Sequence, residues 1–283
     1  MTVIQAQPRV LNARDTGALR ALVDADPIVN CVVDSRLQAV PDLDPQRFGG
    51  FVWGLDGPDG RLRAAVFHGG NLIPIGDDLD AMEILGAQLA RSMRGCSSIV
   101  GPGGAVEVLW SQLTPRWGPA RAIRTSQPLL VTRNPSTVPV DPYVRPVVAG
   151  ELERFLPAAV AMFTEELDAS PNGADGGRSY RNRVAELIGG ERAFARFDER
   201  GRVVFKAEIG SLSPGTAQIQ GVWVRPDLRG LGLGRAGMAA VLEYGLRRAP
   251  TVSLYVNSYN STARALYDRL GFVQLTTLRT ILF

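Results

Sequence analysis

The chain has 283 residues, of which 45% are hydrophobic, and a formal net charge of +3. This length predicts two domains, because single hydrophobic cores stop growing near roughly 250 to 300 residues. The small charge surplus does not indicate a nucleic-acid partner. No apolar run reaches the roughly 18 residues of a membrane helix, and the first residues lack a signal-peptide pattern. We therefore expect a cytoplasmic protein with no nucleic-acid or membrane partner.

The first half of the chain alternates between strand patterns and helix patterns. A glycine-containing turn at residues 56–60 separates two apolar runs and predicts a hairpin. Apolar residues three and four apart predict an amphipathic helix with Met93 as its last inward residue. The predicted elements are a strand ending at Val10–Leu11, a helix capped at Asp15–Thr16, strands 51–55, 62–67, 71–75 and 98–100, a helix over 81–93 and a helix after 101–104.

Reactive side chains are few in this half. His68 is the only histidine, and it can serve as a base or pack structurally; the absence of an evident partner favours the structural role. Cys31 and Cys96 can form at most one bridge, which is no disulfide framework. The sequence has neither the Gly-x-Ser-x-Gly elbow of hydrolases nor a His/Cys cluster for zinc, so we expect no metal.

Three prolines among polar residues at 133–142 indicate an extended linker. We place a domain boundary there, which gives domains 1–138 and 139–283. The second domain opens as the first does, with a short strand and an apolar helix about 136 residues further on. The elements predicted for it are a helix over 151–163, a helix over 180–188, strands 193–197, 203–209, 216–224 and 252–256, a helix that Ser261 caps and Gly271 ends, and a hairpin over 272–283.

Residues 222–235 form the most informative stretch of the sequence. A strand ends at Val224, Gly230, Gly232 and Gly234 follow, and a helical pattern begins directly after them. Glycines without Cβ atoms let an anion reach the free N–H groups of a helix start. The P-loop reading fails because no lysine follows the glycines. The dinucleotide reading matches in glycine spacing but lacks the acidic residue after the next strand.

A third interpretation fits both this loop and a second motif downstream. Arg229-x-x-Gly232-x-Gly234 resembles the pyrophosphate loop of the GNAT superfamily of N-acetyltransferases, and Val222-x-Val224-x-Pro226 resembles the end of their fourth strand. The second motif, Asn260-x-x-Ala263-x-x-x-Tyr267-x-x-x-Gly271-Phe272, resembles their second signature, the helix beside the thiol end of coenzyme A. The two motifs cover about a tenth of the chain.

The resemblance implies an α+β fold of two tandem GNAT-like lobes. Each lobe would be a mixed, mostly antiparallel sheet flanked by helices, and strands 4 and 5 of the C-terminal lobe would splay apart. The N-terminal lobe is expected to be degenerate. At the corresponding position it has Gly76-Asp77-Asp78, whose carboxylates would repel a pyrophosphate.

The resemblance also implies that acetyl-CoA is the cosubstrate and assigns residues to it. The pantetheine arm would pair with the main chain at Val222, Trp223 and Val224, and the second motif would contribute Asn260, Ala263 and Tyr267. The pyrophosphate would rest on Arg229, Gly230, Leu231, Gly232, Leu233, Gly234 and Arg235.

For the reaction, the resemblance implies Tyr267 as the acid that protonates the leaving thiolate; packing in the apolar stripe of its helix is the alternative. Many family members have a glutamate on the fourth strand, where this chain has Gln218 and Gln220. We predict Glu208 as the substitute base, with an ion pair to Lys206 as the alternative.

We therefore expect an acetyl-CoA-dependent N-acetyltransferase that acts on a primary amine. An acidic loop over residues 163–177 would suit a cationic acceptor or simply be solvated. A non-catalytic acetyl-CoA sensor remains the alternative, and aminoacyl transfer from tRNA is disfavoured by the low net charge. The sequence predicts neither the acceptor nor the oligomeric state.

Overall fold

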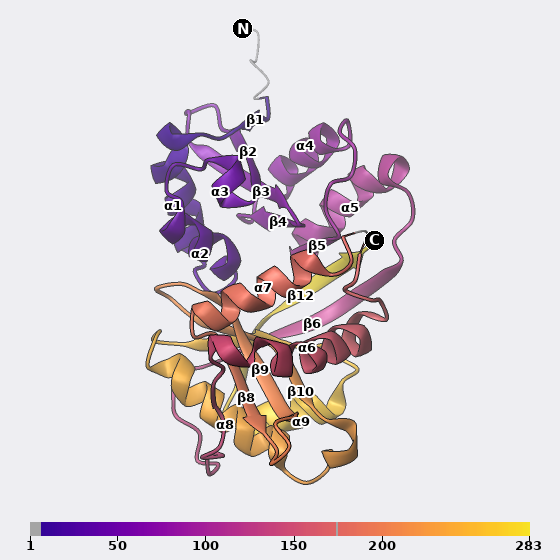
Figure 1. Ribbon diagram of the computed structural model, residues 1–283. Coiled ribbons are helices and arrows are strands. Elements are labelled where there is room, and N and C mark those ends of the chain that lie inside the picture. The colour runs from indigo at the N-terminus through magenta and orange to yellow at the C-terminus, as the bar shows by residue number, and fades with distance from the viewer. Residues whose placement is uncertain (1–6, 174) are drawn as a thin grey trace, which may run out of the picture. The chain divides into compact units, whose positions relative to one another are not determined.

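The computed structural model describes residues 7–173 and 175–283 (Figure 1). The chain divides into two compact units that are interleaved along the sequence. Unit 1 comprises the described residues up to Leu129 together with Tyr255–Tyr259 and Gln274–Phe283, and unit 2 comprises Leu130–Leu254 and Asn260–Val273. The boundary predicted between domains 1–138 and 139–283 stays a prediction. No helix among the described residues is long and apolar enough to cross a membrane.

Unit 1 is a mixed sheet with helices on both faces. Its strands lie in the order β1-β2-β3-β4-β5-β12-β6, and β4 and β5 run parallel, with Asn71 paired with Ser98 and Leu72 with Ile99. The strands are β1 (Arg9–Val10), β2 (Gly50–Asp56), β3 (Leu62–Gly69), β4 (Asn71–Ile75), β5 (Ser98–Pro102), β6 (Ala122–Thr132) and β12 (Val273–Leu282).

Two hydrophobic cores lie on opposite faces of this sheet. One core packs α1 (Thr16–Ala25), α2 (Cys31–Ala39) and α3 (Pro45–Phe48) against side chains such as Phe67 and Ile73. The other packs α4 (Leu79–Leu89) and α5 (Gly103–Trp117) against side chains such as Val66 and Leu72. Because successive side chains along a strand point to opposite faces of the sheet, each strand contributes residues to both cores. Cys31 and Cys96 are buried and not bridged.

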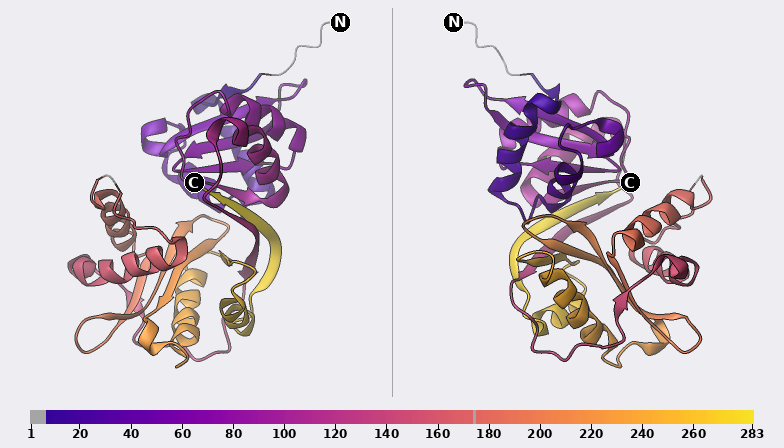
Figure 2. Two further views of the ribbon diagram at one scale, coloured as in Figure 1. Left: turned by 90° about the vertical axis from the view of Figure 1, so that its right-hand side faces the viewer. Right: turned by 60° about the vertical axis from the view of Figure 1, so that its left-hand side comes forward.

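Unit 2 repeats this topology. Its strands lie in the order β11-β10-β9-β8-β7, and β10 and β11 run parallel, paired at Ala217↔Val252 and Gln218↔Ser253. The strands are β7 (Arg145–Pro146), β8 (Ala193–Phe197), β9 (Val203–Leu212), β10 (Ala217–Val224) and β11 (Val252–Tyr255); the helices are α6 (Leu152–Leu167), α7 (Arg178–Gly189), α8 (Leu233–Leu246) and α9 (Ser261–Arg269). The α6 and α7 helices cover one face of the strands, as Figure 2 also shows.

The structure corrects three expectations from the sequence and adds elements that the sequence did not predict. The helix expected over 81–93 ends at Leu89, and Met93 is 92% exposed because residues 90–97 turn back towards β5. The hairpin expected over 272–283 is the single strand β12, antiparallel to β5; its sequence contains no glycine, proline or asparagine to form a turn. Asn260, rather than Ser261, caps α9. The elements α2, α3 and β6 were not predicted.

Gly237 fixes how closely α8 approaches β9. A Cβ atom at Gly237 would lie 2.8 Å from ring atoms of the buried Phe205. We expect Gly237→Ala to lower the free energy of unfolding by about 1–3 kcal/mol, because the core has no room for a methyl group. Urea unfolding followed by circular dichroism measures this change.

Gly189→Ala is the matched control, since Gly189 also lies in a helix and a Cβ there would meet nothing within 4 Å. It should be neutral or stabilising by up to about 1 kcal/mol. Equal unfolding midpoints for the two variants would contradict the close packing at Gly237.

Candidate functional site

The site is built on an irregular strand. In β10, Gln220 pairs with Glu208 of β9, but the next pair is Trp223 with Lys206, so Gly221 and Val222 form a bulge. Gly221 has φ +61°, a left-handed conformation that glycine adopts without strain. A bulge bends its strand and turns main-chain groups away from the ladder. The bulge therefore presents the backbone of Gly221–Val222 to whatever lies beside β10.

The neighbouring strand leaves room at the same point. The described pairing of β10 with β11 stops at Gln218↔Ser253, whereas β10 continues to Val224. Val222 and Val224 are half-buried and Trp223 is buried. The expected splay of strands 4 and 5 in the C-terminal lobe is thus present, and it exposes a strand edge next to the bulge.

The glycine loop follows directly after this edge. A short 3₁₀ turn, Pro226–Leu228, leads to Gly230 with φ +80° and to Gly232 with φ +81°, which precedes the first residue of α8. Side chains at Gly230 or Gly232 would meet nothing within 4 Å, so the loop borders open space. In the described part of the chain, the N–H groups of residues 230–234 donate no hydrogen bond. These donors are what an anion at a helix start requires.

Gly234 brings the second motif against the loop. A Cβ atom at Gly234 would lie 3.3 Å from both Val224 and Leu266, so the end of β10, the start of α8 and the middle of α9 meet there. On α9, the Asn260 side chain accepts a hydrogen bond of 3.1 Å from the Ala263 N–H. The structure therefore brings residues of the two motifs together. The Asn260 side chain itself caps α9.

Tyr267 lies inside unit 2, with its ring 5.9 Å from that of Phe272. Burial raises the pKa of the Tyr267 hydroxyl, and the charge of Glu166 raises it further. Tyr267 is therefore protonated at neutral pH, as an unperturbed tyrosine also is, and the raised pKa makes it a weaker proton donor.

Arg229 is paired with α6. Its Nη2 donates to Glu165 Oε2 at 2.7 Å, and its Nε donates to the Val224 carbonyl oxygen at 3.0 Å. Glu165 also accepts from Trp223 Nε1 at 3.2 Å. The hydrogen bond from Arg229 lowers the pKa of Glu165, so this carboxylate stays ionised. Arg235 is exposed and has no ion pair among the described residues.

Glu208 lies under the bulge in a buried ion pair. Lys206 Nζ is 2.5 Å from Glu208 Oε1, and the two residues are 0% and 4% exposed. Gln220 Nε2 is 3.5 Å from Glu208 Oε2. A Cβ at Gly221 would lie 3.0 Å from Lys206 Nζ, so the pair packs directly against the bulge. The ion pair that the sequence left as an alternative exists, and Oε2 is the oxygen not taken by Lys206.

A family model described as the acetyltransferase (GNAT) family matches residues 164–272, which contain the bulge, the glycine loop and α9. This match places a domain similar to the GNAT acetyltransferase family in the C-terminal half of the chain. A second model, described as a domain of unknown function (DUF4081), matches residues 50–155. A search of curated proteins finds no match. The match to this family model supports a transferase that moves acyl groups.

Solved structures share the fold over nearly the whole chain. An acetyltransferase of the GNAT family from Colwellia psychrerythraea has a TM-score of 0.57 at 10% identity and covers 98% of this chain and 99% of its own. A GCN5-related N-acetyltransferase from Sphaerobacter thermophilus has 0.57 at 17%, covering 97% and 95%. A tandem GNAT protein from the clavulanic acid biosynthesis pathway has 0.54 at 14%, covering 98% and 98%. At these identities the likeness shows the fold alone, including two tandem GNAT lobes.

The GNAT topology of unit 1 lacks the glycine loop. At the start of α4, the Asp78 carboxylate accepts from the Ala81 N–H at 2.9 Å and pairs with Arg63. The protein's own carboxylate therefore occupies the helix start that in unit 2 stays open. His68 lies 6.0 Å, ring to ring, from Trp117, and burial lowers its pKa. No group of three potential metal ligands occurs among the residues described.

The sequence motifs do not mark the bulge at Gly221 or the burial of Lys206. A glycine inside an apolar strand pattern signals a bulge, and that signal was available at Gly221. Lys206 is the sole lysine among 31 basic residues. A compositional bias towards arginine explains why lysine is rare in this chain but not why position 206 has one. In the structure, Lys206 lies in a strand that is buried throughout from Val203 to Gly210, so its charge is buried as well.

Replacing one partner of the buried pair tests how far its stability depends on charge balance. We expect Lys206→Met to lower the free energy of unfolding by about 3–5 kcal/mol, because the Glu208 carboxylate would remain buried without a counter-charge. The double variant Lys206→Met/Glu208→Met should regain most of that loss. Chemical denaturation of the full chain measures both values.

Arg47→Met removes one side of an exposed pair with Asp42 and serves as the control; it should leave the unfolding midpoint nearly unchanged. If the double variant were less stable than Lys206→Met, the loss would come from side-chain shape and not from the unbalanced charge.

Proposed function

We propose that this protein is an N-acetyltransferase that moves the acetyl group of acetyl-CoA to a primary amine by direct attack. One observation carries the proposal: the bulged, splayed end of β10 leads straight into the loop of free N–H groups at 230–234. A strand edge followed by an anion-binding helix start matches a ligand with an amide-containing arm and a diphosphate.

The cosubstrate would lie along this edge. Its pantetheine arm pairs with the backbone at Val222–Val224, and its pyrophosphate accepts hydrogen bonds from residues 230–234. Arg229 and Arg235 add positive charge at the two ends of the loop. Arg229 now donates to the Val224 carbonyl oxygen, so it must turn away before the arm can bind there.

The acetyl carbonyl would lie at the bulge. Main-chain N–H groups released by the bulge stabilise the negative charge that develops on the carbonyl oxygen as the amine attacks. Tyr267 gives its proton to the departing thiolate. Glu208 takes a proton from the amine through its Oε2 oxygen, directly or through water, while Lys206 holds the other oxygen in place.

The acceptor side of the site is acidic. Glu165 and Glu166 lie on α6, and Asp168 follows at the end of that helix. Glu165 is within hydrogen-bond distance of Trp223 on β10, which places α6 beside the proposed reaction centre. A protonated amine would be attracted to these carboxylates, and this supports a cationic acceptor.

The second candidate is a sensor that binds acetyl-CoA without transferring the acetyl group. It is favoured by Gln218 and Gln220 in β10 and by the tie between Glu208 and Lys206. Release of the free thiol from acetyl-CoA, measured with a panel of amines and without amine, separates the two candidates. An enzyme releases thiol faster with a suitable amine, whereas a sensor binds the cosubstrate and releases none.

Gly232→Val should abolish acetyl-CoA binding measured by calorimetry, because the side chain would fill the space over the N–H groups of the loop. Gly60→Val is the matched control: Gly60 has φ +76°, close to the +81° of Gly232, and also has nothing within 4 Å of its Cβ position. The two variants share the backbone strain, so only Gly232→Val should lose the ligand. Unchanged binding in Gly232→Val would reject the loop assignment.

Tyr267→Phe should lower kcat about 100-fold or more and leave the KM for acetyl-CoA nearly constant, because the change removes a proton donor but keeps the ring. Tyr244→Phe makes the same change on α8, beside Phe194, and should leave turnover intact. Thiol release at saturating amine measures both variants. An unaltered kcat in Tyr267→Phe would leave this residue with a packing role only.

A further inference from the structure

The N-terminal half has no net charge, but its two parts, residues 1–83 and 84–140, carry charges of opposite sign. Residues 1–83 contain seven arginines and twelve acidic residues, whereas residues 84–140 contain six arginines and one acidic residue, Glu107. Glu107 is itself paired with Arg279. The span from 84 to 140 therefore carries a positive charge that its own sequence does not balance.

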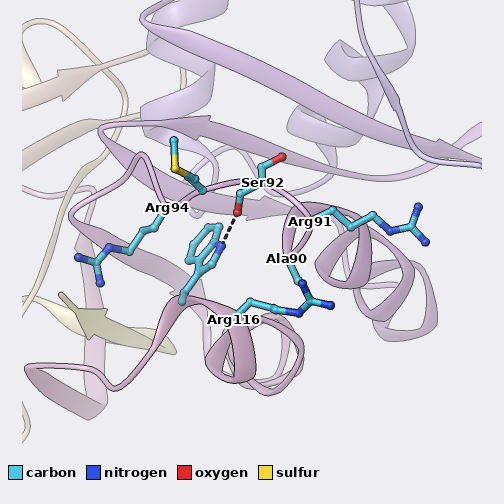
Figure 3. A pocket seen from close by; sticks show the side chains of 7 residues that line it. Ala90, Arg91, Ser92, Arg94 and Arg116 are labelled. Carbon is cyan, nitrogen blue, oxygen red and sulfur yellow. Dashed lines mark hydrogen bonds between the residues drawn. The ribbon is translucent and has the colours of Figure 1, made fainter.

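Three of these arginines gather at one place in unit 1. Arg91 and Arg94 follow the end of α4, and Arg116 lies at the end of α5; together with Ala90, Ser92, Met93 and Trp117 they line one hollow (Figure 3). All three are exposed, and in the described part of the chain none of them has a carboxylate partner. Arg9, Arg47 and Arg61, which are exposed elsewhere in unit 1, each have a carboxylate partner.

The hollow has a rigid base. Trp117 is 8% exposed, and its Nε1 donates to the Ser92 carbonyl oxygen at 3.0 Å, which ties the end of α5 to the turn after α4. The Phe283 ring lies 6.0 Å from that of Trp117, and the Arg94 guanidinium lies 4.4 Å from the centre of the Phe283 ring. This cation–π contact holds one positive charge in place without neutralising it.

The directions of the arginines indicate the kind of ligand. Figure 3 shows Arg94 extending to one side of the hollow and Arg91 and Arg116 to the other, so the three groups do not converge on one point. A single small anion cannot contact all of them, whereas an anion with several separated phosphate groups can. Guanidinium groups bind phosphate oxygens through paired hydrogen bonds, and a tryptophan this deeply buried offers no face for stacking a base.

We propose that this hollow is a second binding site, separate from the acetyltransferase loop, for a ligand that carries several phosphate groups. The phosphates can belong to a free oligophosphate or to a phosphorylated lipid headgroup, and both present the same chemistry to the arginines. The site does not depend on the proposed acetyl transfer, because none of its residues belongs to the GNAT match at 164–272.

Tripolyphosphate is the probe for the free ligand, and vesicles with phosphatidylinositol bisphosphate are the probe for the headgroup. Binding of the full chain is measured by calorimetry and by vesicle sedimentation at low ionic strength, where exposed charges are least screened. Both use the Gly232→Val background, so that the acetyl-CoA loop cannot contribute. We expect Arg91→Gln/Arg94→Gln/Arg116→Gln to weaken binding by about tenfold for each arginine.

The control is Arg14→Gln/Arg47→Gln/Arg61→Gln, which removes the same charge from exposed positions outside the hollow. Loss of either probe in the first triple variant and not in the control supports the site, and the probe that binds identifies the source of the phosphates. Equal losses in both variants would show general electrostatic attraction, and no binding of either probe would also overturn the proposal. Near-ultraviolet circular dichroism checks that both variants keep their tertiary structure.

Discussion

The site in unit 2 depends on one constraint: β10 must part from β11 while it remains in the sheet. Two paired residues at the start of β10 anchor the strand, and its far end continues to Val224 without β11 beside it. A backbone edge left in this way needs hydrogen-bond partners, since unpaired main-chain groups are costly when they are removed from water. The bulge at Gly221–Val222 adds more such groups at the same place. The strand that runs through the core of unit 2 therefore also presents main-chain groups outside the sheet ladder.

Unit 1 shows that the fold alone does not make this site. Its β4 and β5 also pair in parallel over two residues, and the chain then enters α4 as β10 leads towards α8. The difference lies in the residues between strand and helix. Asp78 caps α4 with its own carboxylate and is held by Arg63, whereas Gly232 leaves the start of α8 open. One topology thus carries a closed helix start in unit 1 and an open one in unit 2, which agrees with the view that function lies in sites placed on folds.

The sequence predicted most of the strands and the position of the glycine loop because their signals are local. The turn residues at 56–60, the apolar runs on either side of them and the helical pattern of α8 each act within a few residues. The strand pairing of residues 273–283 could not be predicted in this way. Their apolar alternation indicates strand, but which strand they join is decided by pairing with β5, about 180 residues earlier in the chain. The prediction that Met93 faces inward was wrong for a related reason. Periodicity shows which face of a helix is apolar but not at which residue the helix ends.

The buried pair of Lys206 and Glu208 is the hardest feature to explain by stability alone. A buried ion pair is often no more stabilising than apolar side chains of similar size, because both charges lose their hydration. The surroundings of the pair could hold such side chains, since Phe155 and Met162 already pack there. An arginine would be the expected basic residue in a chain with one lysine, but the enclosed space suits the compact ammonium group of lysine. The pair lies directly against the bulge in β10. The proposed role of Glu208 as the base that takes a proton from the amine would account for a buried carboxylate at this position.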